Sequence, residues 1–343
     1  MEYYNQSYFN NTLGSNGRGE KMKNWGEGEL INWILEKENP SVRFFTLTKI
    51  LGNSLDTFEV KQVRKDIMQI GPVPQILALQ NPDGWWGSAD NATMPMYTST
   101  AWQLMILAEL GATKEDLRID KAVDFVFRKA QDKAGAFPHE GSRWQKVSSM
   151  DLICNDGMIA WGLIGVGTPY ANPSMKLTVD FLASAINHTD FKCRFNQGAP
   201  CAWGLVKALR VLAAIPKNVW TLEIKQAVEK AVNFILEKDL SKADYPTKPG
   251  GKVSGHWFKF GFPRSYQTDV LQTTRILIDL GYSKDKRMMP AVDFLLSKRL
   301  NDGTWPLEET FNKMLVPFVK KSNCKPSKWV TWQVLYILKK AGK

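Results

Sequence analysis

Apolar residues recur at helical spacing along most of the chain, with charged residues between them. Six segments resemble one another in this pattern and in sequence, from INWILEK at the first to VNFILEK at the fifth: residues 31–37, 72–77, 123–125, 179–181, 232–238 and 292–294. Spacings of three and four residues between apolar positions predict amphipathic helices, each with one face in water.

A second set of helical segments alternates with the first and is apolar on most faces. It comprises residues 44–52, 98–111, 157–165, 201–215, 268–281 and 329–342. Small residues such as Gly162 and Gly204 would allow close approach between these helices. A helix that is apolar on most sides is buried on most sides, so this set is expected to lie inside the first.

The strict alternation predicts an all-α fold, an (α/α)6 toroid with six inner and six outer helices. The chain begins with an outer-type helix at residues 29–38 and ends with an unpartnered inner-type helix, so these two can pair and close the ring. We therefore expect a single domain over residues 25–343, preceded by a disordered tail at residues 1–24. The insertion at residues 240–264 is expected to cap one mouth of the ring.

Two similar loops join outer to inner helices at opposite ends of the chain. One reads QNPDGWWG at residues 80–87 and the other reads NDGTW at residues 301–305. Asn, Asp and Gly favour tight turns, because glycine accepts a positive φ and the Asn or Asp side chain bonds nearby backbone. The tryptophans of these loops are expected to be buried between helices and to have a structural role.

This repeat resembles the QW-type repeat of squalene and oxidosqualene cyclases and of protein prenyltransferase β subunits. The match is best at residues 80–85 and 300–305 and weaker at residues 131–137. The resemblance implies a toroid with a central cavity for a hydrophobic, isoprenoid-type ligand that can bear a diphosphate. The chain contains no Asp-Asp dipeptide and no Asp-X-Cys, so the catalytic signatures of both groups are absent. Prenyltransferases of this type also act with a second subunit, which the sequence does not test.

The net charge of +11 is spread over many helical segments. No Arg-rich arm or zinc-finger spacing accompanies it, so a nucleic-acid partner is not expected. Attraction to anionic lipid headgroups or to a diphosphate fits the charge equally well. The first residues lack the basic and apolar regions of a secretory signal, which predicts a cytoplasmic or membrane-surface location. The four cysteines are expected to be free thiols.

Candidate site residues follow from helix polarity, because the N-terminal ends of the inner helices should share one mouth and favour an anion. The densest grouping runs from residue 256 to residue 269. Candidate acids or bases are Asp269, His256 and Asp156, and candidate ligand-binding residues are Tyr266, Arg264, Lys259, Trp203, Trp102 and Asp151. The alternative for this grouping is a loop packed over the mouth, with Ser265 capping the next helix and Asp269 in its first turn.

Cys154, Cys201 and His256 would suit Zn²⁺ if they converged, and the sequence indicates no other cofactor. Buried cysteines also occur simply as small apolar residues. Two further functions stay open beside the isoprenoid hypothesis. One is a carbohydrate-active (α/α)6 enzyme, with Asp151 or Asp156 paired with Asp269. The other is a toroid that serves as a scaffold without catalysis.

Overall fold

The computed structural model describes residues 27–138, 153–265, 267–310, 313–319 and 325–343. These residues contain thirteen α-helices and no β-strand, which confirms the prediction of an all-α chain. Within the same ranges, no helix combines the length and the apolar content needed to cross a bilayer. Tyr266, Asp151 and the tail at residues 1–24 lie outside the described residues.

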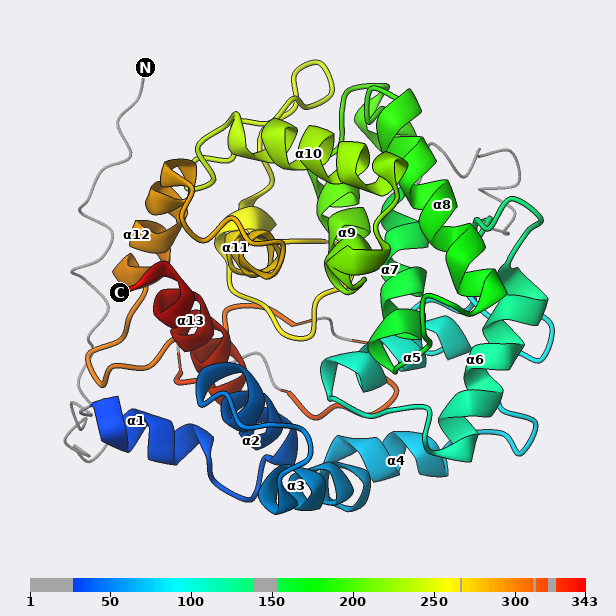
Figure 1. The fold of residues 1–343 in the computed structure, drawn as a ribbon, viewed down its shortest axis with the longest axis vertical. Coiled ribbons are helices and arrows are strands. Elements are labelled where there is room, and N and C mark those ends of the chain that lie inside the picture. Colours follow the sequence, from blue (N-terminus) through cyan, green and yellow to red (C-terminus); the bar gives the residue numbers. More distant parts are fainter. Residues whose placement is uncertain (1–26, 139–152, 266, 311–312, 320–324) are drawn as a thin grey trace.

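The helices fall into two layers (Figure 1). The inner layer contains α2 (Pro40–Phe45) continued by the π-helix η2 (Thr46–Ile50), α5 (Thr100–Glu109), α7 (Ile153–Gly165), α9 (Ala202–Ala213), α11 (Val270–Asp279) and α13 (Lys328–Ala341). The outer layer contains α1 (Glu27–Ile34), α3 (Phe58–Gln69), α4 (Pro72–Ala78), α6 (Leu117–Ala130), α8 (Pro173–His188), α10 (Leu222–Leu236) and α12 (Met289–Ser297).

Neighbouring inner helices contact one another in chain order. From α5 onward each inner helix packs against the next, and α13 then packs against α2 and η2. The last helix also contacts α1, which brings the two ends of the helical region together. Inner helices α5, α7, α9 and α11 are covered by α6, α8, α10 and α12.

Glycines permit the closest approaches inside this layer. A methyl group at Gly162 on α7 would lie 2.9 Å from the backbone nitrogen of Met105 on α5, and one at Gly204 on α9 would lie 2.6 Å from the side chain of Ile153. Both distances are too short for a Cβ atom. The expectation that small residues bring the inner helices together is confirmed at these two positions.

The two similar loops are built in the same way. The buried Trp86 donates its indole N–H to the carbonyl of Ile76, ten residues earlier, and its backbone N–H to the Thr100 hydroxyl. The buried Trp305 bonds Leu295, also ten residues earlier, and Thr331 on the following inner helix. Each loop therefore ties an outer helix to the next inner helix. The predicted burial is confirmed for Trp86 and Trp305, whereas Trp85 is half-buried.

The predicted strict alternation of six outer and six inner helices is wrong at helix α3, because α3 and α4 are two successive outer helices between α2 and α5. The sequence of α3 does not resemble the other outer helices, but it buries Val60, Val63 and Ile67 at spacings of three and four residues. The first inner helix also begins earlier than expected, at Pro40, because Asn39 caps it by accepting the N–H of Val42. Four of the predicted inner segments end at a glycine, and these residues, Gly52, Gly111, Gly281 and Gly342, all have positive φ as expected at the end of a helix.

Candidate functional site

A cavity of about 220 Å³ lies in the middle of the inner layer. Every inner helix contributes to its wall. The aromatic part of the wall consists of Phe45, Trp161, Trp332 and Tyr336. Phe45 stacks on Trp332 with ring centroids 4.8 Å apart, so this part of the wall is flat and apolar.

Charged side chains complete the wall of the central cavity. Three are cations, Lys49, Arg210 and Arg275, and two are acids, Glu109 and Asp279. Arg210 lies 3.8 Å above the ring of Trp161 and forms a buried ion pair with Glu109. Burial alone would raise the pKa of Glu109, but the Arg210 guanidinium outweighs it and lowers that pKa. Glu109 is therefore ionised, and one positive charge remains in excess.

Several N–H groups around this cavity have no acceptor among the described residues. They are Nε and Nη2 of Arg210 and the indole nitrogens of Trp161 and Trp332. An unsatisfied buried donor costs ~1–3 kcal/mol, so four in one place call for an explanation. These donor atoms are themselves buried, so an anionic ligand in the cavity would supply the missing acceptors after a shift of the wall side chains.

The central cavity lies toward the C-terminal ends of the inner helices. Glu109 and Asp279 are the last residues of α5 and α11, and Ala214 follows the end of α9. Lys49, Ala214 and Asp279 are exposed, so the cavity reaches solvent on this side. Helix polarity favoured the N-terminal ends for an anion, and the C-terminal ends carry partial negative charge. The aromatic and cationic groups nevertheless gather at the C-terminal ends, so the cations there must outweigh the helix dipoles to bind an anion.

At the N-terminal end of α11, the candidates Arg264 and Asp269 neutralise each other. Arg264 Nε donates to the Asp269 carboxylate over 2.7 Å, and both side chains are buried. Asp269 also accepts the backbone N–H groups of Gly261 and Gln272 and is the N-cap of α11. The capping role that the sequence assigned to Ser265 therefore belongs to Asp269. Neither Arg264 nor Asp269 presents a free charge to a ligand.

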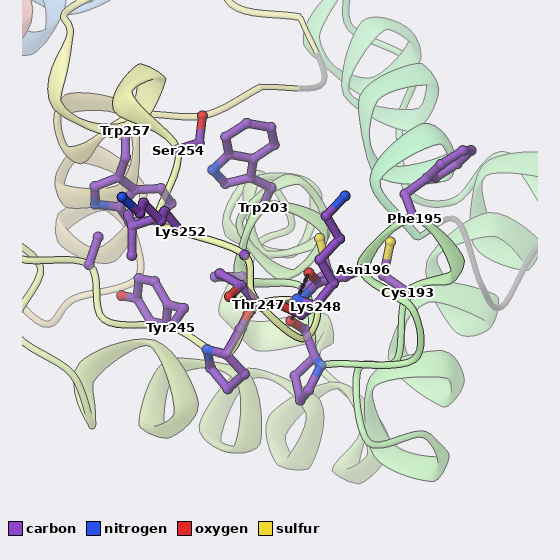
Figure 2. Close-up of a pocket in the computed structure, with 17 residues that line it drawn as sticks. Cys193, Phe195, Asn196, Trp203, Tyr245, Thr247, Lys248, Lys252, Ser254 and Trp257 are labelled. Carbon is purple, nitrogen blue, oxygen red and sulfur yellow. Dashed lines mark hydrogen bonds between the residues drawn. The ribbon is translucent and has the colours of Figure 1, made fainter.

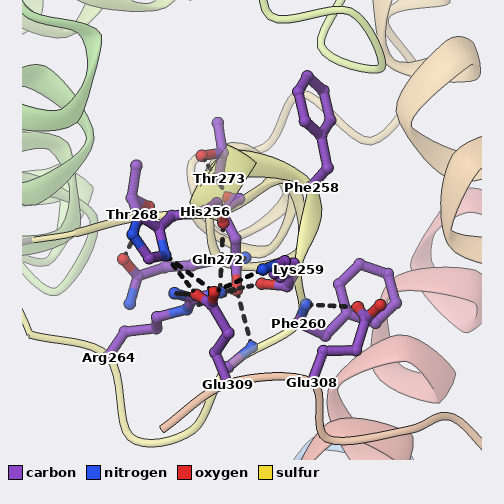
Figure 3. Close-up of polar contacts among 12 residues, drawn as sticks. His256, Phe258, Lys259, Phe260, Arg264, Thr268, Gln272, Thr273, Glu308 and Glu309 are labelled. Atoms are coloured by element: carbon purple, nitrogen blue, oxygen red, sulfur yellow. Dashed lines mark hydrogen bonds and ion pairs between the residues drawn. The ribbon is translucent and has the colours of Figure 1, made fainter. Parts of the chain in front are cut away.

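His256 contacts a carboxylate that the sequence interpretation missed. Its Nδ1 lies 2.8 Å from both carboxylate oxygens of Glu309, and Figure 3 shows Lys259 and Arg264 converging on the same group. Lys259 Nζ lies 3.4 Å from Glu309 and Arg264 Nη1 lies 3.2 Å from it. Burial alone would raise the pKa of Glu309, but the hydrogen bond from His256 and the charge of Arg264 outweigh it and lower that pKa. Nδ1 is thus held by Glu309.

The insertion before α11 lies against the interior of the inner layer, as expected for a cap. Gly261, Phe262 and Arg264 share a small cavity with Glu109, Arg275 and Gln333. Glu308 fixes the same segment, since its carboxylate accepts the backbone N–H of Phe260 over 2.7 Å and pairs with Lys298. One feature of the sequence could have drawn attention to Glu308 and Glu309: both lie just after the second repeat loop at residues 301–305.

Asp156 is buried in the first turn of α7. Its Oδ1 accepts the backbone N–H of Phe137 over 2.6 Å, and its Oδ2 has no partner among the described residues. Burial raises the pKa of Asp156 to about 8. The carboxyl therefore keeps its proton under most conditions, and it faces no open groove.

Because Asp156 is buried, we expect the stability of the fold to depend on pH. Because the pKa of Asp156 is about 8 in the folded chain and about 3.9 in an unfolded one, the folded state binds more protons between these values. Stability from this group is therefore lost as pH rises from about 4 to 8, by at most ~1.4 kcal/mol per pH unit. Asp156→Asn keeps the acceptor for Phe137 and removes the titration. Urea denaturation at several pH values in this range should show that the free energy of unfolding falls less for the variant than for the wild type as pH rises. Parallel curves would contradict the prediction.

The proposed zinc ligands do not form a site. No group of three His, Cys, Asp or Glu side chains among the described residues is placed to hold a metal ion. Burial raises the pKa of Cys154 to about 12, so its thiol is protonated. Two main causes raise the pKa of Cys201. The larger is a hydrogen bond with Cys193, and the smaller is burial. His256 is engaged by Glu309 instead. Cys154, Cys193 and Cys201 are free thiols, as expected, and Cys324 lies outside the described residues.

The two candidate tryptophans differ in their surroundings. Trp102 is buried, and its indole N–H donates to the Thr93 carbonyl over 3.3 Å, so it does not line the central cavity. Trp203 lines a second cavity, formed with the insertion. Neither residue reaches the central cavity, whose tryptophans are Trp161 and Trp332.

Comparison with known proteins places the chain in no family. No family model matches it, and no curated protein is significantly similar to it.

Proposed function

We propose that the protein is an (α/α)6 toroid of the cyclase and prenyltransferase type, and that its central cavity binds a short isoprenoid with an anionic head group. The layered alternation of helices and the identical bonding of Trp86 and Trp305 support the toroid. This proposal concerns binding; the catalytic signatures of the two enzyme groups are absent from the sequence.

The observation that carries the proposal is the pairing of aromatic walls with unsatisfied cationic donors. Phe45, Trp161 and Trp332 offer flat apolar surface to a hydrocarbon chain. Arg210 offers two N–H groups that have no acceptor among the described residues. A phosphate or diphosphate has several oxygen acceptors and matches a guanidinium well.

The size of the cavity favours a short ligand. The cavity has a volume of about 220 Å³. A five-carbon prenyl unit fits this space with its head group at Arg210, and a longer chain would extend past the exposed Lys49 into solvent. We therefore expect dimethylallyl diphosphate and geranyl diphosphate to bind more tightly than farnesyl diphosphate.

The carbohydrate alternative finds no support in the described residues. It requires two carboxylates beside an open groove, but Asp156 and Asp269 are 0% and 1% exposed. Asp269 is also held by Arg264 and by the N-terminus of α11.

Isothermal titration calorimetry with the three diphosphates tests the proposal. Lys49→Glu reverses an exposed charge at the cavity opening and should weaken binding about tenfold, which is ~1.4 kcal/mol. Trp161→Phe keeps the aromatic wall but removes an unsatisfied N–H, and it should weaken binding about two- to fivefold because one acceptor interaction, ~0.5–1 kcal/mol, is lost.

Lys65→Glu is the matched control, because Lys65 is an exposed lysine on the outer helix α3 and does not line the cavity. It should bind as the wild type does. The proposal fails if the folded wild type binds none of the three diphosphates, or if Lys65→Glu and Lys49→Glu weaken binding equally.

A further inference from the structure

A second and separate cavity of about 300 Å³ lies between two loops on the N-terminal side of α9. One side is the segment at residues 193–203, which leads into α9. The other is the part of the insertion at residues 243–257. Figure 2 shows Trp257 and Tyr245 on one side of it and Cys193 on the other, with Trp203 and Lys248 between them. We call it the insertion pocket.

Four aromatic residues, Phe195, Trp203, Tyr245 and Trp257, are among the residues that line the insertion pocket. Tyr245 donates its hydroxyl to the Ile235 carbonyl over 2.8 Å, and Trp257 donates its indole N–H to the Leu240 carbonyl over 3.1 Å. Their polar atoms are therefore used outside the pocket. The two rings pack edge to face at 5.1 Å. What they offer to a ligand is apolar ring surface.

A single side chain holds the two loops together. Asn196 donates its amide to the carbonyls of Pro200 and Pro246, over 2.9 and 3.1 Å. Its carbonyl oxygen accepts the backbone N–H of Lys248 over 2.8 Å. These bonds fix the distance across the pocket, so the cavity is a built feature of the fold.

The charge around the insertion pocket is positive and has no counterion. Lys248 and Lys252 line it, and neither has a carboxylate partner among the described residues. The only acidic residue in either segment, Asp244, does not line the pocket. Cys201 and Trp203 bring the N-terminal end of α9 to the same cavity, which adds a partial positive charge.

We infer that the insertion pocket binds a small organic anion with an aromatic or branched apolar body. The rings of Trp203, Tyr245 and Trp257 hold the body, and Lys248 with Lys252 holds a phosphate or carboxylate group at the rim. This site is independent of the central cavity, because no lining residue is shared between the two.

The test uses the full chain and the fluorescent aromatic sulfonate 8-anilinonaphthalene-1-sulfonate. We expect saturable fluorescence enhancement and displacement of the probe by phenyl phosphate or phenylacetate at concentrations at least tenfold lower than by neutral benzyl alcohol. Displacement by either anion supports the inference, and the stronger one identifies the head group. The double variant Lys248→Glu/Lys252→Glu should weaken probe binding at least tenfold, and Trp203→Ala should weaken it as well.

The matched control is Lys65→Glu/Lys129→Glu, which makes the same charge change at two exposed lysines on outer helices. It should bind the probe with unchanged affinity. The inference is overturned if the Lys248/Lys252 variant also binds the probe normally, or if benzyl alcohol competes as well as the anions. It is likewise overturned if Lys49→Glu, at the central cavity, removes the probe signal instead.

Discussion

Replacement of Trp305 by alanine is expected to lower the free energy of unfolding by ~3–5 kcal/mol. Trp305 is 1% exposed, and its indole N–H bonds the Leu295 carbonyl over 2.6 Å. The substitution removes a large buried ring and also leaves that carbonyl without its donor. Urea denaturation followed by circular dichroism measures the loss.

Two further tryptophans make this prediction specific to the repeat loops. Trp86→Ala should cost a similar amount, because Trp86 makes the same two kinds of bond. The control Trp85→Ala removes a half-buried ring from the same loop and should cost less than about 1.5 kcal/mol. A smaller loss for Trp305→Ala than for Trp85→Ala would show that these loops do not tie the two helix layers together.

Replacement of Glu109 by glutamine is expected to destabilise the chain by ~3–5 kcal/mol. The side chains of Glu109 and Arg210 are 5% and 4% exposed, so the substitution leaves the Arg210 charge buried without its carboxylate. Glutamine has nearly the same shape as glutamate, so the loss of stability reports the loss of the carboxylate charge. Denaturant unfolding of the purified variant at neutral pH gives the value.

A double variant distinguishes a lost charge from a damaged core. Glu109→Leu/Arg210→Met removes both charges and should be more stable than Glu109→Gln, since apolar replacements of buried ion pairs are often tolerated. The single variants Glu109→Leu and Arg210→Met are measured in parallel. If the double variant loses as much free energy of unfolding as the two single variants together, the two side chains act independently and the buried pair has no special role.

Local sequence patterns predicted most of the helices and the glycines that follow four of the inner helices, because helix periodicity and glycine caps depend on near neighbours. The glycines at residues 52, 111, 281 and 342 are examples. Helix α3 was missed because the comparison looked for a repeat, although its apolar spacing was readable.

The site was harder to predict, because its contacts join residues far apart in the chain. His256 and Glu309 are 53 residues apart, and Arg210 and Glu109 are 101 residues apart. One signal was available for the central cavity: Lys207, Arg210 and Arg275 are cations within largely apolar inner helices, and Arg210 and Arg275 line the cavity. A charge in such a helix needs a partner or a ligand, and that reasoning would have pointed to the C-terminal ends.

The most direct test of the central claim is a crystal structure of the protein soaked with geranyl diphosphate. The account predicts electron density for the prenyl chain between Trp161 and Trp332, with phosphate oxygens within hydrogen-bond distance of Arg210. An empty central cavity at a ligand concentration that saturates binding in solution would contradict it, as would density confined to the insertion pocket.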